Sequence, residues 1–220
     1  MIDGITLSID AVGVAVKAAT PLVAASSAVV GGGIIEAAAI LNVHVEKHGS
    51  LEAVRASLEA FAGRHAISAP YVGLLTGAAT EKAEVETARH GDLTALAVVT
   101  VGLSNRITAG VSPAVVTVPA STINIIVVVD GDAEPAALVN ALMTVTEVKT
   151  LALVEAGVKA ADGHVATGTS TDAVVIAATG RGARQRFGGP ISPLGWVIAQ
   201  AVGPALRRGI ARWLAERPNG

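Results

Sequence analysis

The segment 123–129 constrains the fold more than any other part of the chain. Every residue in it except Asn124 is apolar, which is typical of a strand that is covered on both faces. The turn signal Asp130-Gly131-Asp132 follows immediately, and a helix pattern follows the turn. The sequence therefore predicts a layered fold in which this strand lies inside a sheet.

Other short segments rich in Val, Ile and Thr predict further strands. The predicted strands are residues 5–16, 40–45, 93–103, 121–129 and 172–178. Helices are predicted at 51–61 with Ser50 as cap, at 134–156 with Gly157 as stop, and from Ser192 to about Glu216. Pro204 is expected to kink or divide the last helix. This order predicts an α/β or α+β fold, a single-domain sandwich of mixed β-sheet with a long buried helix and a C-terminal helix, over residues 1–220.

The run 22–41 is twenty residues long and mostly apolar, which is long enough to cross a membrane. Gly31-Gly32-Gly33 interrupts its middle, however, and its flanks carry no Trp, Tyr or Arg anchors. We therefore interpret it as a buried strand, a tight glycine turn and a second element.

The charge balance argues against nucleic acid as a partner. Charged residues make up 15% of the chain, the formal net charge is -2 and aromatic residues make up 2%, so there is neither a basic field for phosphates nor a platform for base stacking. The chain has no cysteine, which excludes disulfides and thiolate nucleophiles. Because the N-terminus lacks the basic start of a secretory signal, we expect a cytoplasmic protein without a membrane partner.

Polar side chains mark one face of the predicted long helix. Asn140, Thr144 and Glu147 follow at spacings of four and three, so they share a face, with Thr150 on the Glu147 side. Lys149 points to a different side, so it and Glu147 are expected to serve different partners. A carboxylate on so apolar a helix is either functional, solvated or bonded to neighbouring donors.

The loop Thr167-Gly168-Thr169-Ser170-Thr171-Asp172 gathers hydroxyls and a carboxylate just before a predicted strand. Its N–H groups and hydroxyls suit an anion, an amide or a tetrahedral oxyanion, and Gly168 permits close approach. The alternative is a turn whose side chains bond their own backbone. These residues alone leave phosphate and amide binding equally open.

Asn42, Asn105 and Asn124 lie within or at the end of apolar strands, where an amide side chain needs a hydrogen-bonding partner. Together they suggest a pocket that recognises amides, although any one of them can be structural. The five histidines form no metal-binding motif, and neither a Gly-x-Ser-x-Gly elbow nor a Walker A loop is present. No metal or cofactor is predicted, and metal dependence stays open.

Several short segments, taken in order, resemble the adenosylcobinamide amidohydrolase family. They are Ser26-Ser27 with Gly31-Gly32-Gly33, Leu41-Asn42-Val43, Val72-Gly73-Leu74-Leu75-Thr76, Thr100-Val101-Gly102-Leu103-Ser104-Asn105, Thr122-Ile123-Asn124-Ile125, Thr146-Glu147-Val148-Lys149-Thr150 and Ala166-Thr167-Gly168-Thr169. The resemblance spans residues 26–178. Ser121 stands where the family usually has glycine and Val148 where it has alanine, and these changes bear on pocket shape.

The resemblance implies hydrolysis of the amide that joins the aminopropanol arm to the corrin ring of adenosylcobinamide, giving adenosylcobyric acid for coenzyme B12 synthesis. The implied substrate-binding residues are Asn42, Thr76, Ser104, Asn105, Asn124, Thr150, Thr167, Gly168 and Thr171.

Amide hydrolysis needs an activated nucleophile, a stabilised oxyanion and a proton for the departing amine. We hypothesise that Glu147 or Asp172 is the general base and that Lys149 or the N–H groups of residues 167–169 stabilise the oxyanion. A variant of this mechanism uses Thr169 or Thr171 as a covalent nucleophile.

Two other classes of function fit parts of the sequence. A non-catalytic corrinoid- or nucleotide-binding protein would use the same Gly-Thr loop without chemistry. A membrane-surface protein would use Arg207, Arg208, Arg212 and Trp213 of the last helix, although their apolar neighbours are more simply core. The expected partner is a small-molecule corrinoid, and a homo-oligomer is possible.

Overall fold

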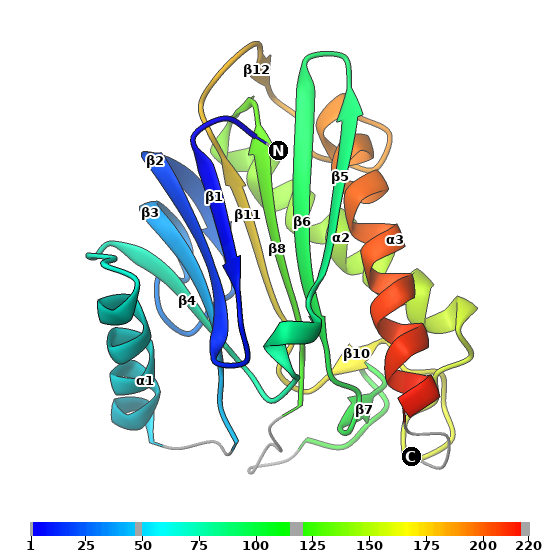
Figure 1. Cartoon of the computed structure of the whole chain (residues 1–220). Coiled ribbons are helices and arrows are strands. Elements are labelled where there is room, and N and C mark those ends of the chain that lie inside the picture. The colour runs from blue at the N-terminus through cyan, green and yellow to red at the C-terminus, as the bar shows by residue number, and fades with distance from the viewer. Residues whose placement is uncertain (1, 47–49, 115–120, 217–220) are drawn as a thin grey trace.

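The computed structural model describes residues 2–46, 50–114 and 121–216 (Figure 1). Its strands are β1 (Ile5–Ile9), β2 (Gly13–Ser26), β3 (Gly33–His44), β4 (Tyr71–Thr76), β5 (Glu84–His90), β6 (Leu93–Val101), β7 (Arg106–Ile107), β8 (Ile123–Asp130), β9 (Asp132–Ala133), β10 (Gly168–Thr169), β11 (Ala173–Ala178) and β12 (Arg184–Gln185). Its helices are α1 (Leu51–Arg64), the short 3₁₀ turn η1 (Thr80–Lys82), α2 (Pro135–Glu155) and α3 (Pro193–Glu216).

Eight strands form one mixed sheet in the order β4-β3-β2-β11-β8-β6-β5, with β1 paired to β2. Strand β8 lies inside this sheet, parallel to β11 and antiparallel to β6. Its residues 123–129 are buried throughout, at 1% exposure or less. The prediction of a mixed α/β fold built around a doubly covered strand is confirmed.

The two faces of the sheet are covered differently. Helices α2 and α3 pack against one face, α3 on β5 and β6 and α2 on β2 and β11 (Figure 1). On the other face, the sheet curls so that its two halves meet: side chains such as Leu22 and Leu74 from β2 and β4 pack with Leu96 and Ile126 from β6 and β8. The strand ends at the starts of the paired strands β8 and β11 form part of the candidate site.

The prediction of one strand over residues 5–16 is wrong, because this segment is a hairpin. Asp10 accepts hydrogen bonds from the N–H groups of Val12, at 2.7 Å, and Gly13, at 2.9 Å, and β1 pairs antiparallel with β2 with Ile9 opposite Val14. The Asx-type turn at Asp10 reverses the chain inside an otherwise strand-like pattern.

The prediction for residues 22–41 is confirmed in its outline. Strand β2 ends at Ser26, a glycine turn follows, and β3 begins at Gly33. Gly31 and Gly33 have φ of 68° and 89°, in the left-handed region that favours glycine. The second element is a strand that pairs antiparallel with the first.

The ends of the helices follow the predicted caps, but Pro204 does not divide the last helix. Ser50 accepts from the N–H of Ala53 at 3.3 Å, and Ser192 accepts from the N–H of Gly195 at 3.1 Å. Helix α3 runs through Pro204 without interruption. The residue before it is Gly203, which has no Cβ to clash with the proline ring.

Helix α2 is buried on one side only, which corrects the prediction of a long helix buried in most directions. Its inner side includes Leu138, Val145 and Leu153, all fully buried, whereas its outer side exposes Met143 at 59% and Leu151 at 51%. It is the one helix among the described residues that is long and apolar enough to cross a membrane, and 44% of that window is buried inside the protein.

A glycine contact fixes the segment before α3 against α2. The N–H of Gly188 donates to Asn140 Oδ1 at 3.3 Å, and its carbonyl accepts from Thr144 Oγ1 at 2.8 Å. A Cβ on Gly188 would lie 2.1 Å from the carbonyl oxygen of Ala137. Asn140 and Thr144 therefore serve this packing contact.

The substitution Gly188→Ala is expected to lower the free energy of unfolding by about 1–3 kcal/mol, because the added methyl group forces the segment away from α2. Urea denaturation measures this change. The control Gly63→Ala lies in α1, where an added Cβ meets nothing within 4 Å, and it should leave stability equal or higher. Equal stability of Gly188→Ala and wild type would show that this contact is not tight.

Candidate active site

The carboxylate of Asp172 ties together the starts of two central strands. It lies directly before β11 and accepts from the N–H of Ile123, the first residue of β8, at 3.0 Å. It also accepts from the N–H of Thr169 at 3.0 Å and from the hydroxyl of Thr169. Because β8 and β11 run parallel, this one side chain holds both strand starts and the loop between β10 and β11.

Lys149 completes the cluster from α2, where its ammonium forms an ion pair with Asp172. Both side chains are only 9% exposed, so the pair is compact and nearly dry. A Cβ at Gly168 would lie 2.5 Å from Asp172 Oδ2 and 2.8 Å from Lys149 Nζ, so only glycine lets the loop pass over the pair. As the helical spacing predicts, Lys149 pairs with a residue other than Glu147.

An open cavity of about 480 Å³ lies above Asp172; we call it the Asp172 cleft. Its lining residues are Ser27, Val29, Val54, Leu74, Leu75, Gly77, Ser121, Thr122, Thr171, Asp172 and Ala173. The lining is mostly apolar with several hydroxyl groups, and its one carboxylate is neutralised by Lys149. Such a site suits a large uncharged ligand better than a phosphate.

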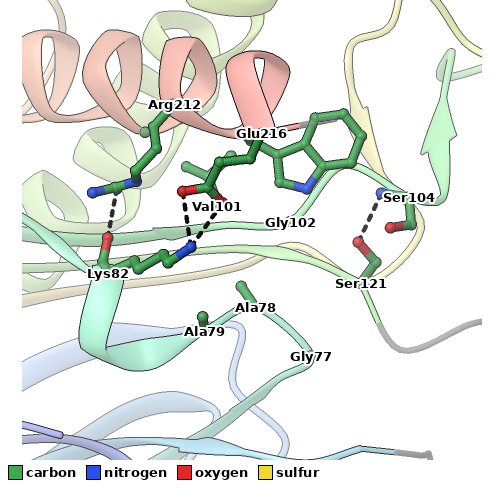
Figure 2. Close-up of a pocket in the computed structure, with 12 residues that line it drawn as sticks. Gly77, Ala78, Ala79, Lys82, Val101, Gly102, Ser104, Ser121, Arg212 and Glu216 are labelled. Carbon is green, nitrogen blue, oxygen red and sulfur yellow. Dashed lines mark hydrogen bonds and ion pairs between the residues drawn. The ribbon is translucent and has the colours of Figure 1, made fainter. Parts of the chain in front are cut away.

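A second, more polar cavity of about 240 Å³ adjoins the first; we call it the Arg212 cleft. Figure 2 shows Lys82 paired with Glu216 at 2.8 Å and Arg212 directed at the carbonyl of Lys82. Gly77 and Ser121 line both clefts, so the two clefts are neighbours, and we call them together the depression.

Asn42 and Asn124 converge, as predicted, but they bond to each other beneath the cleft. Asn124 Nδ2 donates to Asn42 Oδ1 and to the carbonyl of Leu75, each at 2.8 Å, and Asn42 Nδ2 donates to Thr100 Oγ1 at 3.0 Å. Thr122 Oγ1 donates to Asn124 Oδ1 at 3.3 Å. These buried amides therefore fasten β3, β4, β6 and β8 together.

Asn105 lies apart from the other two asparagines, with its amide bonded to the hydroxyl of Ser170. The structure therefore joins two of the three asparagines in one network, and the binding of substrate amides by these residues stays a prediction. Asn105 follows the end of β6, whereas Asn42 and Asn124 lie within the curled part of the sheet.

The remaining predicted binding residues divide between the cleft lining and the framework. Thr171 lines the Asp172 cleft and Ser104 lines the Arg212 cleft. Thr76 is buried and accepts from the N–H of Ala78 at 3.0 Å. Thr150 donates to the carbonyl of Thr167 at 3.3 Å, so these two residues join α2 to the loop 167–172.

Glu147 lies outside this cluster. Its side chain is exposed on the outer side of α2, in a shallow depression with Leu142, Met143 and Thr146, while Thr150 faces inward to the loop. The hypothesis that Glu147 is the general base is therefore corrected. Glu147 and Thr150 are about one helical turn apart in sequence, but they do not share a site.

Across residues 2–46, 50–114 and 121–216, no group of three or more His, Cys, Asp or Glu side chains is arranged to hold a metal ion. The described lining of the Asp172 cleft offers hydroxyl groups and the carboxylate of the Lys149–Asp172 pair, and that of the Arg212 cleft adds the charged side chains of Lys82, Arg212 and Glu216.

The sequence model of the adenosylcobinamide amidohydrolases (CbiZ) matches residues 4–218. The chain belongs to this family. The match confirms the resemblance that the short segments predict, and it places the Asp172 cleft in an amidohydrolase. No curated protein sequence matches the chain.

Among solved structures, this amidohydrolase is similar to the PH0078 protein from Pyrococcus horikoshii OT3, with a TM-score of 0.49 and 16% identity over 96% of this chain and 80% of that one. It is also similar to a Burkholderia sp. beta-aminopeptidase, with a TM-score of 0.47 and 13% identity over 90% of this chain and 78% of that one.

Sequence reasoning missed Ser121 and Thr122 as site residues of this amidohydrolase. Both line the Asp172 cleft, although they are 4% and 2% exposed. A signal was present, because two adjacent hydroxyl residues stand directly before the most buried strand of the chain. Because an apolar run follows them, Ser121 and Thr122 were assigned to the predicted strand 121–129 instead.

Proposed function

We propose that this protein hydrolyses the amide between the aminopropanol arm and the corrin ring of adenosylcobinamide, releasing adenosylcobyric acid. The observation that carries the proposal is the family match over residues 4–218. It supports an amidohydrolase, and the named substrate is the one that the family's description prints.

The shape and chemistry of the two clefts support a corrinoid substrate. The depression is open and includes both clefts, which share Gly77 and Ser121, and this suits a broad, flat ligand. Its larger part, the Asp172 cleft, is lined by apolar side chains and hydroxyl groups, which match a ring fringed with uncharged carboxamides. The described residues that line this cleft include no Lys or Arg to bind a phosphate.

In this proposal, the Lys149–Asp172 pair positions the site. Asp172 accepts from Ile123 N–H, Thr169 N–H, Thr169 Oγ1 and Lys149 Nζ. These four donors already occupy the two oxygens of the carboxylate. Its contribution is to hold the strand starts that line the cleft.

Thr169 is poorly placed to act as a nucleophile. Its hydroxyl already donates to Asp172, and it is 6% exposed beneath the loop, outside the lining of both clefts. Thr171 lines the cleft, and its hydroxyl donates to the carbonyl of Ser121 at 3.3 Å. Of the two predicted hydroxyl nucleophiles, Thr171 has the better access to a ligand.

The rival function is a corrinoid-binding protein without catalysis.

We also propose that the protein acts in the cytoplasm on a free small molecule, without nucleic acid or membrane partners. The exposed apolar side of α2, which includes Met143 and Leu151, is compatible with a homo-oligomer.

Incubation of the purified protein with adenosylcobinamide is expected to release one aminopropanol for each adenosylcobyric acid formed. Mass spectrometry of both products measures this stoichiometry. The matched control is adenosylcobyric acid as the starting ligand, which has no amide arm to lose and should remain unchanged. Saturable binding of adenosylcobinamide without release of aminopropanol would favour the rival function.

A further inference from the structure

The peptide bond between Ser121 and Thr122 lies at the centre of the depression. Ser121 lines both clefts and Thr122 lines the larger one, and Figure 2 shows Ser121 facing Ser104 across the edge of the Arg212 cleft. The next residue, Ile123, begins strand β8. This backbone segment is therefore held on one side by the sheet and borders open space on the other.

Both residues of this bond are held by defined hydrogen bonds. The hydroxyl of Thr171 donates to the carbonyl oxygen of Ser121 at 3.3 Å, and the N–H of Gly102 donates to the carbonyl oxygen of Thr122 at 3.0 Å. Ser104 N–H donates to Ser121 Oγ at 2.9 Å. If the carbonyl carbon of Ser121 were attacked, negative charge would develop on its oxygen, and the Thr171 hydroxyl would stabilise that charge.

Gly102 keeps the space beside this bond open. A Cβ on Gly102 would lie 3.4 Å from the nitrogen of Thr122 and 3.0 Å from Ser121 Oγ. A side chain at this position would therefore crowd the hydroxyl group of Ser121 and touch the nitrogen of the Ser121–Thr122 peptide bond. The glycine leaves both groups uncrowded.

A hydroxyl nucleophile in this cleft needs a base. Among the described residues that line the Asp172 cleft, Asp172 is the one ionisable side chain, and its oxygens already accept bonds from Ile123, Thr169 and Lys149. Thr122 Oγ1 is bonded to the amide oxygen of Asn124, which is no base. One established solution is a threonine whose own terminal α-amine accepts the hydroxyl proton.

We propose that the protein cleaves its own Ser121–Thr122 peptide bond and that the new N-terminal Thr122 is the nucleophile of the amidase. The self-cleavage stands on the geometry of the peptide bond, and the catalytic role of Thr122 rests on the proposed function. A free α-amine has a pKa of about 7.7–8.0, which suits a base that works near neutral pH.

The self-cleavage consumes no reactant other than water. Thr122 Oγ1 attacks the carbonyl carbon of Ser121, the oxyanion accepts from Thr171, and the hydroxyl proton passes to the Thr122 nitrogen as the C–N bond breaks. This gives an ester between Ser121 and Thr122 Oγ1 with a free α-amine. Water then hydrolyses the ester, leaving the Ser121 carboxylate and the Thr122 hydroxyl.

The two resulting chains would remain associated. Residues before the cut supply β2 and β6, and residues after it supply β8 and β11, yet the sheet order is β2-β11-β8-β6. Helix α3, from the second chain, packs on β6 of the first. The hydrogen bonds and core of the sheet thus cross between the chains at two strand pairings.

In the catalytic cycle, the Thr122 hydroxyl attacks the substrate amide carbon and its proton passes to the α-amine. The protonated amine then donates to the departing aminopropanol as the C–N bond breaks, leaving an acyl ester on Thr122. Water, deprotonated by the same amine, hydrolyses this ester and restores the hydroxyl.

Intact-mass spectrometry and N-terminal sequencing of the purified full chain test the proposal. Wild type is expected to give two chains, one ending at Ser121 and one beginning at Thr122, and Thr122→Ser should be cleaved at the same peptide bond. Thr122→Ala is expected to remain one chain and to release no aminopropanol. Thr171→Val, which removes the donor on the Ser121 carbonyl, should slow cleavage by roughly 10-fold or more.

The exposed control Thr87→Ala should be cleaved and active like wild type. A wild-type protein that stays in one piece overturns the proposal, and so does aminopropanol release by Thr122→Ala at the wild-type rate. If wild type is cleaved after Ser121 but does not attack adenosylcobinamide, the self-cleavage stands and the proposed substrate fails.

Discussion

The substitution Asp172→Asn is expected to destabilise the protein by about 3–5 kcal/mol, because it leaves a buried cation without its counter-charge. Lys149 is 9% exposed and pairs with Asp172. The new amide group would also present N–H donors where the carboxylate now accepts from Ile123 and Thr169. Urea denaturation measures the loss.

The substitution should also lower turnover. Asp172 anchors the first residue of β8, and Ser121 and Thr122 lie directly before it. A displacement of about 1 Å in this segment is enough to cost roughly 10²-fold in rate. Release of aminopropanol, measured under conditions in which the variant is folded, separates this effect from lost stability.

The substitution Lys149→Met removes the other member of the pair, and its loss of stability can be compared with that of Asp172→Asn. It leaves a carboxylate that still accepts from Ile123 N–H, Thr169 N–H and Thr169 Oγ1, so its cost should be clearly smaller than that of Asp172→Asn. The exposed control Asp92→Asn should stay within about 0.5 kcal/mol of wild type. Equal losses for Asp172→Asn and Asp92→Asn would show that the buried pair does not hold the site.

Those parts of the fold that depend on local pattern were predictable. The continuous apolar run 123–129, the caps at Ser50 and Ser192 and the glycine interruption at 31–33 each act within a few residues. Strand order was not predictable, because it depends on which strands meet after the sheet curls. The hairpin at Asp10 was missed because a strand-like pattern continues on both sides of a short turn.

The candidate site was predicted in part, for a related reason. The loop 167–172 and Lys149 stood out as polar groups in apolar surroundings, and the structure joins them through Asp172. Glu147 stood out equally, but helical spacing alone does not say which side of α2 faces the sheet. Ser121 and Thr122 gained their position only through β6, β8 and β11, which come together from distant parts of the chain.

The amide network beneath the cleft should be similarly intolerant of substitution. Asn124 lies in β8, 1% exposed, and satisfies three groups at the base of the cleft: Asn42 Oδ1, the carbonyl of Leu75 and the hydroxyl of Thr122. The substitution Asn124→Leu keeps the volume and the apolar neighbours but leaves these groups unpaired. Each stranded group costs about 1–3 kcal/mol, so the variant should lose more stability than any surface substitution.

A double-mutant cycle with Asn42→Leu shows whether the network acts as a unit. If the two amides chiefly satisfy each other, the double variant should be less destabilised than the sum of the single variants, with a coupling energy of about 0.5–3 kcal/mol. The control Asn140→Leu removes one bond, to Gly188 N–H, from a half-buried site and should cost much less. Strictly additive losses would mean that Asn42 and Asn124 stabilise their strands independently.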